Sequence, residues 1–167
     1  MVQPYFHSVT LDSDNCKGCT ICIKRCPTEA IRVRGGKARI LETRCIDCGE
    51  CIRTCPNHAK RAIADDFSLL GKYAYTVALP APSFYAQFSG QDVSISKILQ
   101  ALLTLGFNAV YEVAVAAEHV SLATLRYIES TAKRPLISSS CPAIVRLIQV
   151  RFPDLIDHLI PIQAPVD

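Results

Sequence analysis

The first third of the chain contains short segments in which apolar and polar residues alternate. This pattern predicts three short strands, at residues 9–11, 31–34 and 38–41, and two short helices, at residues 28–31 and 52–58. The pair Gly35-Gly36 lies between two of the strands and predicts a tight hairpin turn. We therefore expect a small domain of short elements over residues 1–66.

From residue 67 onward, Ala, Val, Leu and Ile dominate and the apolar segments lengthen. Ile95, Ile98 and Leu102 recur at helical spacing and would share one helix face. The pattern alternates between strands, at residues 74–79, 109–115 and 135–138, and helices, at residues 93–104, 118–131 and 143–151. Such alternation predicts a parallel sheet with right-handed crossovers.

Three strands are few for a sheet that helices cover on both faces, so we expect this part to be incomplete. The chain as a whole is predicted to be α+β. The small domain is followed by a linker at residues 67–72 and by a partial α/β domain with a short parallel sheet at residues 73–167.

Charge and hydropathy narrow the classes of protein. A net charge of +3 over 167 residues is too small to predict nucleic-acid binding. The longest apolar-rich stretch, residues 101–117, is interrupted by Thr104, Asn108 and Glu112, so a membrane span is not expected. The first residues lack a charged segment followed by an apolar run, so no secretory signal is predicted. We expect a cytoplasmic protein with reduced thiols.

Eight of the nine cysteines lie in two blocks that repeat at an offset of 29 residues, 16–27 and 45–56. Each block has the spacing C-x2-C-x2-C-x3-C-P, which is typical of proteins that bind 4Fe–4S cubanes. A zinc site with four cysteines usually uses two separated pairs of ligands instead. The blocks therefore predict iron–sulfur clusters rather than zinc or disulfide bonds.

Residues 9–64, with these two blocks, resemble bacterial two-cluster ferredoxins. In those proteins the cysteine before each proline ligates the other cluster. The resemblance implies two 4Fe–4S clusters and one-electron transfer. It assigns to cluster 1 Cys16, Cys19, Cys22 and Cys55, and to cluster 2 Cys45, Cys48, Cys51 and Cys26. Gly18 and Gly49 are expected to let backbone N–H groups approach the sulfurs.

The ninth cysteine, Cys141, follows a predicted strand and precedes a helix that Pro142 opens. This is where ligands bind in open α/β sheets, and a helix N-terminus favours a thiolate. A single cysteine is nevertheless more often a small buried apolar residue. The pattern alone leaves both interpretations of Cys141 open.

Residues 73–167 resemble the start of the catalytic domain of iron-only (FeFe) hydrogenase large subunits. The similarity is clearest at 139–144, Ser-Ser-Cys-Pro-Ala-Ile, which resembles the first active-site motif Thr-Ser-Cys-Cys-Pro-x-Trp, and continues through Phe152-Pro153-Asp154-Leu155. The resemblance implies that Cys141 corresponds to a cysteine that ligates the cubane of the H-cluster. Ser140 then stands where the family has a proton-transferring cysteine.

The chain departs from that family pattern in several places. A hydroxyl at Ser140 relays protons poorly near neutral pH, and Ile144 replaces the tryptophan. Beyond Glu118, the helix that follows lacks further acidic residues at its start. These differences indicate the sensory branch of the family. The sequence ends at Asp167, before the second and third motifs, so we expect a fragment or one part of a split protein, with an H-cluster only if the missing motifs are supplied.

Other candidate residues carry less information. The four histidines, His7, His58, His119 and His158, are scattered and have no metal-binding spacing. Residues 138–140 are expected to form a plain turn, and the carboxylates of Glu112 and Glu118 to face solvent.

Three functional hypotheses remain, and none assigns a catalytic residue. The first is an electron-transfer module joined to the beginning of a hydrogenase-like domain. The others are a non-catalytic redox-sensing or scaffold protein, and a plain two-cluster ferredoxin with an unrelated α/β extension. The expected partners are a redox protein, either a ferredoxin or an oxidoreductase, and a chain that supplies the rest of the domain.

Overall fold

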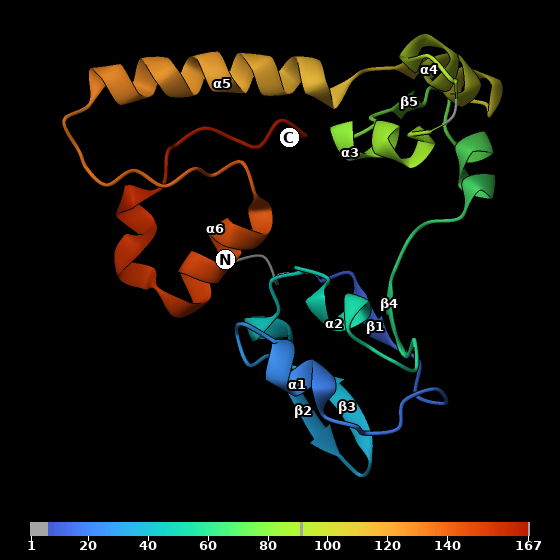
Figure 1. Cartoon of the computed structure of the whole chain (residues 1–167), viewed down its shortest axis with the longest axis vertical. Coiled ribbons are helices and arrows are strands. Elements are labelled where there is room, and N and C mark those ends of the chain that lie inside the picture. Colours follow the sequence, from blue (N-terminus) through green and yellow to red (C-terminus); the bar gives the residue numbers. More distant parts are fainter. Residues whose placement is uncertain (1–6, 91, 167) are drawn as a thin grey trace. The chain divides into compact units, whose positions relative to one another are not determined.

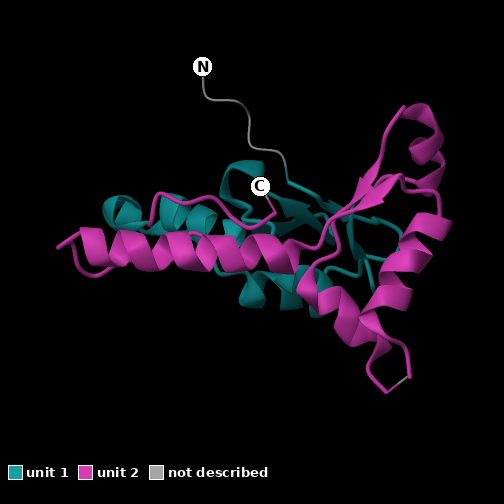
Figure 2. Ribbon diagram, turned by 90° about the horizontal axis from the view of Figure 1, so that it is seen from above, with its two compact units in different colours: residues 1–64, 141–159 teal, residues 65–140, 160–167 magenta. Residues whose placement is uncertain are grey.

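The computed structural model describes residues 7–90 and 92–166. The chain divides into two compact units, coloured separately in Figure 2. Unit 1 comprises Met1–Ala64 with Cys141–Leu159, and unit 2 comprises Asp65–Ser140 with Ile160–Asp167. The two ends of the expected domain ranges, at residues 1 and 167, lie outside the described residues. Helices and short strands are mixed, so the predicted α+β class is confirmed.

Unit 1 contains two antiparallel strand pairs, β1 with β4 and β2 with β3, labelled in Figure 1. Its elements are β1 (Val9–Leu11), α1 (Ile21–Arg25), β2 (Ile31–Arg34), β3 (Lys37–Ile40), α2 (Glu50–Arg53), β4 (Lys60–Ala62), α6 (Pro142–Arg151) and two 3-10 helices, Glu42–Arg44 and Pro153–His158. The β2–β3 hairpin turns at Gly35-Gly36, where both φ angles are positive (57° and 71°). This hairpin confirms the prediction from the sequence, within one residue of the expected bounds.

A small core lies between the strands and the cysteine loops. Cys16, Ile31, Ala38 and Ala59 are buried there, and four further cysteines pack against them, Cys22, Cys26, Cys51 and Cys55. Because so few apolar side chains are buried, the cysteines themselves make up much of the interior. A core of this size gives little stability without a bound metal group.

The 29-residue repeat is also present in the backbone. Residues with positive φ occur at positions that correspond under the 29-residue repeat. They form three pairs, namely Gly18 and Asp47, Thr20 and Gly49, and Glu29 and His58. Backbone with φ near +60° is costly for residues other than glycine, so the loops need supporting contacts to hold it. The matched pairs show that the two cysteine blocks fold into the same loop.

The helix predicted at residues 28–31 is wrong. Helix α1 ends at Arg25, and Cys26 is extended, with φ −78° and ψ 115°. Cys26 precedes Pro27, and a residue before proline is disfavoured in the helical region. The helix predicted at 52–58 is observed as the shorter α2, Glu50–Arg53. It ends early because Cys55 precedes Pro56. The prolines therefore end both helices before the fourth cysteine of each block.

Unit 2 is mainly helical. Its elements are β5 (Val77–Ala78), α3 (Pro82–Tyr85), α4 (Ile95–Thr104), β6 (Ala109–Val110), α5 (Val113–Ser130) and two 3-10 helices, Phe67–Lys72 and Ala86–Phe88. Strands β5 and β6 pair in parallel, with Val77 opposite Ala109 and Ala78 opposite Val110. The short parallel sheet is therefore present. The 3-10 helix Phe67–Lys72 occupies the expected linker.

The strands predicted for unit 2 were too long. The segment 74–79 contributes two residues to β5, and 109–115 contributes two to β6 because α5 already begins at Val113. The run Val-Ala-Val-Ala-Ala at 113–117 contains three alanines, which favour helix. The third strand, at 135–138, does not form. There the carbonyl of Ile137 accepts one hydrogen bond from the Ile160 N–H (2.9 Å), and Pro135 has no N–H to donate.

The predicted helices of the second part form close to their expected positions. Helix α4 begins after Ser94, whose hydroxyl accepts the Lys97 N–H (3.4 Å), and Gly106 follows its end with φ 112°. These are the usual cap residues at the two ends of a helix. Helix α6 begins at Pro142, as its sequence indicated. No helix among the described residues is both long and apolar enough to span a membrane.

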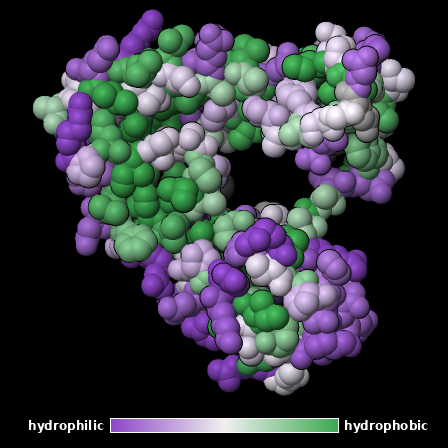
Figure 3. All heavy atoms as spheres, in the orientation of Figure 1, coloured by the Kyte–Doolittle hydropathy of each residue, from purple (hydrophilic) through white to green (hydrophobic). Residues whose placement is uncertain are grey.

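Large apolar side chains reach the surface of both units. Figure 3 colours residues such as Ile, Leu, Val and Phe green, and green spheres are prominent around α6. In unit 1 the exposed apolar residues include Ile144, Phe152, Leu155 and Ile156, and in unit 2 Phe67, Tyr73, Tyr75, Leu122 and Leu125.

Candidate metal centres

Unit 1 contains a cavity lined by four thiols from two distant parts of the sequence. Cys16 and Cys19 come from the loop before α1, Cys22 from α1 itself, and Cys55 from the end of the second block. The empty space amounts to about 350 Å³, including the part open to solvent. The cavity therefore combines the first three cysteines of one block with the fourth cysteine of the other.

A second cavity of unit 1 has the reverse composition. Cys45, Cys48 and Cys51 line it together with Cys26 from the first block. Its empty space, about 360 Å³, is close to that of the first cavity. We call the two spaces cavity 1 (with Cys16) and cavity 2 (with Cys45). Their cysteines are the two sets expected from the ferredoxin resemblance.

Backbone N–H groups donate hydrogen bonds to the sulfurs in both cavities. The Ala30 N–H donates to Cys26 Sγ (3.2 Å), and the Ala59 N–H donates to Cys55 Sγ (3.3 Å). The two bonds are equivalent under the 29-residue repeat, and each follows the sharp turn after a proline. N–H donors at these sulfurs would stabilise thiolate ligands and influence the potential of a cluster bound there.

The loop of cavity 1 depends on close approach between two glycines. Gly18 has φ 64°, and a Cβ added there would lie 2.6 Å from the Gly36 carbonyl oxygen. Gly49, by contrast, has φ 70° with open space around it. Only glycine fits at position 18, because both the backbone angle and the hairpin β2–β3 exclude a side chain.

The turn before Cys16 is held by Asp12. Its carboxylate accepts the N–H groups of Asp14 (3.1 Å) and Asn15 (3.3 Å) and pairs with Arg61 (3.2 Å). These bonds, led by that from the Asn15 N–H, lower the pKa of Asp12 below its usual range. The Asp12 carbonyl then accepts the Cys16 N–H (3.2 Å), which fixes the first ligand of the block.

The thiols differ in how readily they ionise. The Ala38 N–H lies 3.4 Å from Cys16 Sγ and is the main cause that lowers the pKa of Cys16. Burial raises the pKa of Cys22, of Cys45 and of Cys51, which reaches about 11. At neutral pH a metal must therefore displace protons from the buried thiols, and binding weakens as the pH falls.

Cys141 lies outside both cavities. It is exposed and occupies the N-cap position of α6. Near it in the sequence, the hydroxyls of Ser138 and Ser140 lie 3.0 Å apart, and the Ser139 hydroxyl donates to the Ile162 carbonyl. The segment has no helix or strand, and only Ser140 lies at a bend, so the plain turn expected there stays a prediction. The expected ligand role of Cys141 stays a prediction.

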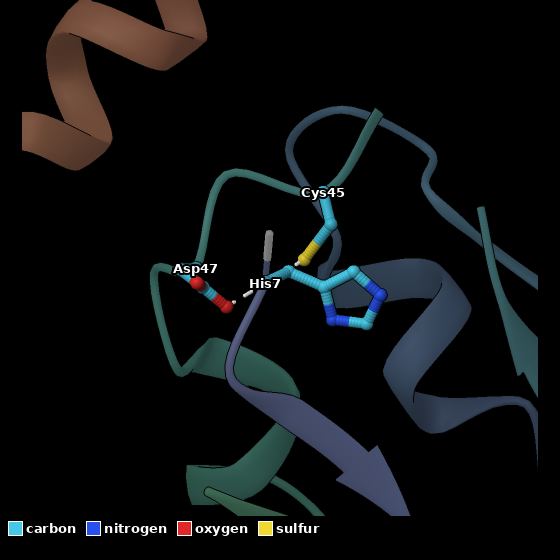
Figure 4. A group of neighbouring side chains, drawn as sticks. All are labelled: His7, Cys45 and Asp47. Atoms are coloured by element: carbon cyan, nitrogen blue, oxygen red, sulfur yellow. Dashed lines mark hydrogen bonds between the residues drawn. The ribbon is translucent and has the colours of Figure 1, made fainter. Parts of the chain in front are cut away.

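The structure places one histidine beside a cysteine of cavity 2. His7, Cys45 and Asp47 lie together in Figure 4, with their ligand atoms within 4.8 Å of one another. The Asp47 carboxylate also accepts the Ser8 N–H (2.8 Å). The sequence offered no sign of this grouping, because His7 lies 38 residues from Cys45 and the bond from Ser8 to Asp47 joins the two segments only in the folded chain.

The carboxylate of Glu112 has a partner in unit 2 that sequence reasoning missed. It accepts a hydrogen bond from the Tyr85 hydroxyl (2.8 Å) and is half-buried. Solvent exposure was the expected state of this group. The bond ties the end of α3 to the residue before α5.

The residues of the two cavities fit iron–sulfur clusters. Each cavity presents four thiols, and all nine cysteines of the chain are free. Four soft thiolate ligands are what a cubane requires, one for each iron. Most of the other lining residues are apolar, for example Val33 and Ala38 in cavity 1 and Ile40 and Ile46 in cavity 2. Such surroundings limit the access of water.

Comparison with protein families agrees with this geometry. Residues 8–56 match the family described as the 4Fe-4S dicluster domain. Residues 74–167, more than half of the chain, match the family described as the iron-only hydrogenase large subunit, C-terminal domain. The chain belongs to the iron-only hydrogenase family. A search of curated proteins found no match.

The family membership confirms the resemblance inferred from the sequence for both parts of the chain. Unit 1 carries an iron–sulfur electron-transfer domain related to those of iron-only hydrogenases, and iron–sulfur clusters are its cofactor.

Proposed function

We propose that unit 1 binds two 4Fe–4S clusters and relays single electrons to or from a hydrogenase-like site. The observation that carries this proposal is the composition of the two cavities, each of which joins three cysteines of one block to the fourth cysteine of the other. When bound, such clusters supply reversible one-electron transfer.

The protein residues have three tasks in this proposal. The eight thiols hold iron, and the crossed arrangement ties the two blocks together. The N–H groups of Ala30, Ala38 and Ala59 orient the sulfurs and favour their thiolate form. The apolar lining excludes water. Because each ligand set takes cysteines from both blocks, neither cluster can be completed unless both blocks are folded.

The crossed ligand sets predict how cysteine variants group. Replacement of Cys55 by serine should disturb the same paramagnetic signal as replacement of Cys16, because both thiols line cavity 1. Cys26→Ser should instead disturb the same signal as Cys45→Ser, because both of these thiols line cavity 2. Electron paramagnetic resonance of the four dithionite-reduced variants measures this. If Cys55→Ser groups with Cys45→Ser, each block binds its own cluster and the proposal is wrong.

A role in hydrogen chemistry would need metal ligands beyond the two cysteine blocks. Cys141 is the only cysteine outside the two blocks, and one thiolate cannot hold a cubane. We propose that any H-cluster requires the ligands of the second and third family motifs in addition to Cys141. A groove in unit 2, about 730 Å³ and open to solvent, offers apolar surface to such a segment, lined among others by Phe67, Val77, Leu79, Phe84, Leu102 and Phe107.

A sensory or scaffold role is the second candidate. It is favoured by Ser140, which stands where the family resemblance expects the proton-transferring thiol. In both candidates a redox protein exchanges electrons with unit 1, and we propose a ferredoxin or an oxidoreductase as that partner. Hydrogen oxidation with a redox dye by the chain together with a segment that carries the second and third family motifs would favour catalysis, and no oxidation would favour sensing.

A further inference from the structure

The 29-residue repeat relates the two cavities to each other position by position. The residues 16, 19, 20, 21 and 22 of cavity 1 correspond to 45, 48, 49, 50 and 51 of cavity 2, and residues 55 and 59 correspond to 26 and 30. The two cavities are therefore close copies in fold and in donor atoms. Where corresponding positions differ in charge, the clusters bound in the two cavities should differ in reduction potential.

Three corresponding pairs of lining residues do differ in charge. Lys17 corresponds to Ile46, Lys60 to Ile31, and Ile21 to Glu50. Among the described residues, cavity 1 is thus lined by two lysines and no carboxylate, and cavity 2 by one carboxylate and no lysine or arginine. All three differences have the same sense, since each makes cavity 1 more positive than cavity 2.

Lys60 is the most informative of these residues. Its side chain is buried, with 3% exposed, and its Nζ atom has no hydrogen-bond partner among the described residues. Burial of an unpaired ammonium is costly unless an opposite charge lies nearby. The corresponding Ile31 has 2% exposure, so an apolar side chain fits this position of the fold without such a cost. A negative group in cavity 1 would provide the missing counter-charge.

Cavity 2 has an additional negative charge beside its first cysteine. One carboxylate oxygen of Asp47 lies 4.0 Å from Cys45 Sγ. The corresponding residue at cavity 1 is Gly18, which has no side chain. Both carboxylates have partners, since Glu50 contacts Arg53 at 2.7 Å and Asp47 accepts the Ser8 N–H (2.8 Å) beside His7.

We propose that these side chains make the cluster of cavity 1 the one with the higher reduction potential, so that it accepts an added electron first. Reduction adds one negative charge to a cluster. A nearby cation stabilises that charge and a nearby anion opposes it. One electron from an external one-electron donor therefore passes from cavity 2 to cavity 1 spontaneously. In that step the cluster of cavity 2 is oxidised and the cluster of cavity 1 is reduced, and no bond is made or broken and no proton moves.

The inference rests on the proposed function, since it requires two clusters in one chain. Its test is a redox titration followed by electron paramagnetic resonance on the reconstituted chain and on the variant Lys60→Met. Loss of the cation should lower both potentials, and the higher one by more. The gap, meaning the difference between the two reduction potentials, should narrow by about 59 mV. For a one-electron couple this corresponds to about a tenfold change in the equilibrium ratio of electrons on the two clusters.

Three further variants sharpen the result. Asp47→Asn should raise the lower potential and also narrow the gap, and asparagine tolerates the positive φ of 54° at that position. Lys60→Arg keeps the cation and should keep the gap. Lys24→Met makes the same change of charge on the exposed surface of α1, and should leave both potentials almost unchanged.

The outcomes separate the two proposals. A gap that widens in Lys60→Met and in Asp47→Asn would place the higher potential in cavity 2 and overturn the inference alone. A gap that does not move in either variant would also overturn it alone. A chain that binds only one cluster would overturn both the inference and the proposed function.

Discussion

Single residues decide whether the cysteine loops can close. Gly18 is the clearest case, because its backbone angle and its distance to Gly36 both exclude a side chain. Asp12 supports the same loop from the other side through its bonds to Asp14 and Asn15. The first ligand of cavity 1 is therefore positioned by contacts within its own loop and with the hairpin.

Replacement of Gly18 by alanine should disrupt this loop far more than the same replacement at Gly49. Both positions have positive φ, which costs about 1–2 kcal/mol for alanine. Only at Gly18 would the new Cβ also collide with backbone, at 2.6 Å from the Gly36 oxygen. We expect Gly18→Ala to retain less iron than Gly49→Ala after reconstitution. Equal iron retention in the two variants would show that the contact with the hairpin is not limiting.

Among the elements, α3 and α5 of unit 2 are joined by the bond from Tyr85 to Glu112. Burial, followed by this bond, raises the pKa of Tyr85 to about 12. Because the folded pKa lies above the ordinary value of 10.0, the contribution of Tyr85 to stability is complete below pH 10 and is lost as the pH rises through 12.

The variant Tyr85→Phe should lower the free energy of unfolding of unit 2 by about 1 kcal/mol near neutral pH. It should also remove the alkaline loss of stability that this tyrosine causes. Denaturant unfolding between pH 7 and pH 12 measures both effects. Tyr75→Phe is the control, since Tyr75 is 65% exposed and should change little. Identical pH profiles for Tyr85→Phe and the parent chain would contradict this account.

Elements that depend on residues close in the sequence could be predicted from the sequence. Elements that depend on contacts between residues far apart in the sequence could not. The β2–β3 hairpin follows from Gly35-Gly36, and α4 from its spacing and its cap Ser94. The helix expected at 28–31 failed because the effect of Pro27 on Cys26 outweighed apolar spacing. The pairing of β1 with β4 joins residues about fifty apart, and only the folded chain shows that His7 lies beside Cys45.

For the whole molecule, the spacing of the cysteines carried most of the functional information. The sequence showed which eight thiols belong together, and the ferredoxin resemblance suggested how they divide into two sets. Lys60 could not be recognised as buried from its own neighbourhood, because lysine is seldom buried. Its correspondence to Ile31 under the repeat was the available signal, and the structure shows that both positions face the interior.

The central claim is that one chain holds two cubanes through its two crossed sets of cysteines. The most direct measurement is the iron and acid-labile sulfide content of the reconstituted chain, with the variant Cys141→Ala as control. We expect about eight irons per chain, four for each cubane, and the same content in the control, because Cys141 lies outside both cavities. About four irons per chain, or zinc in place of iron, would contradict the account.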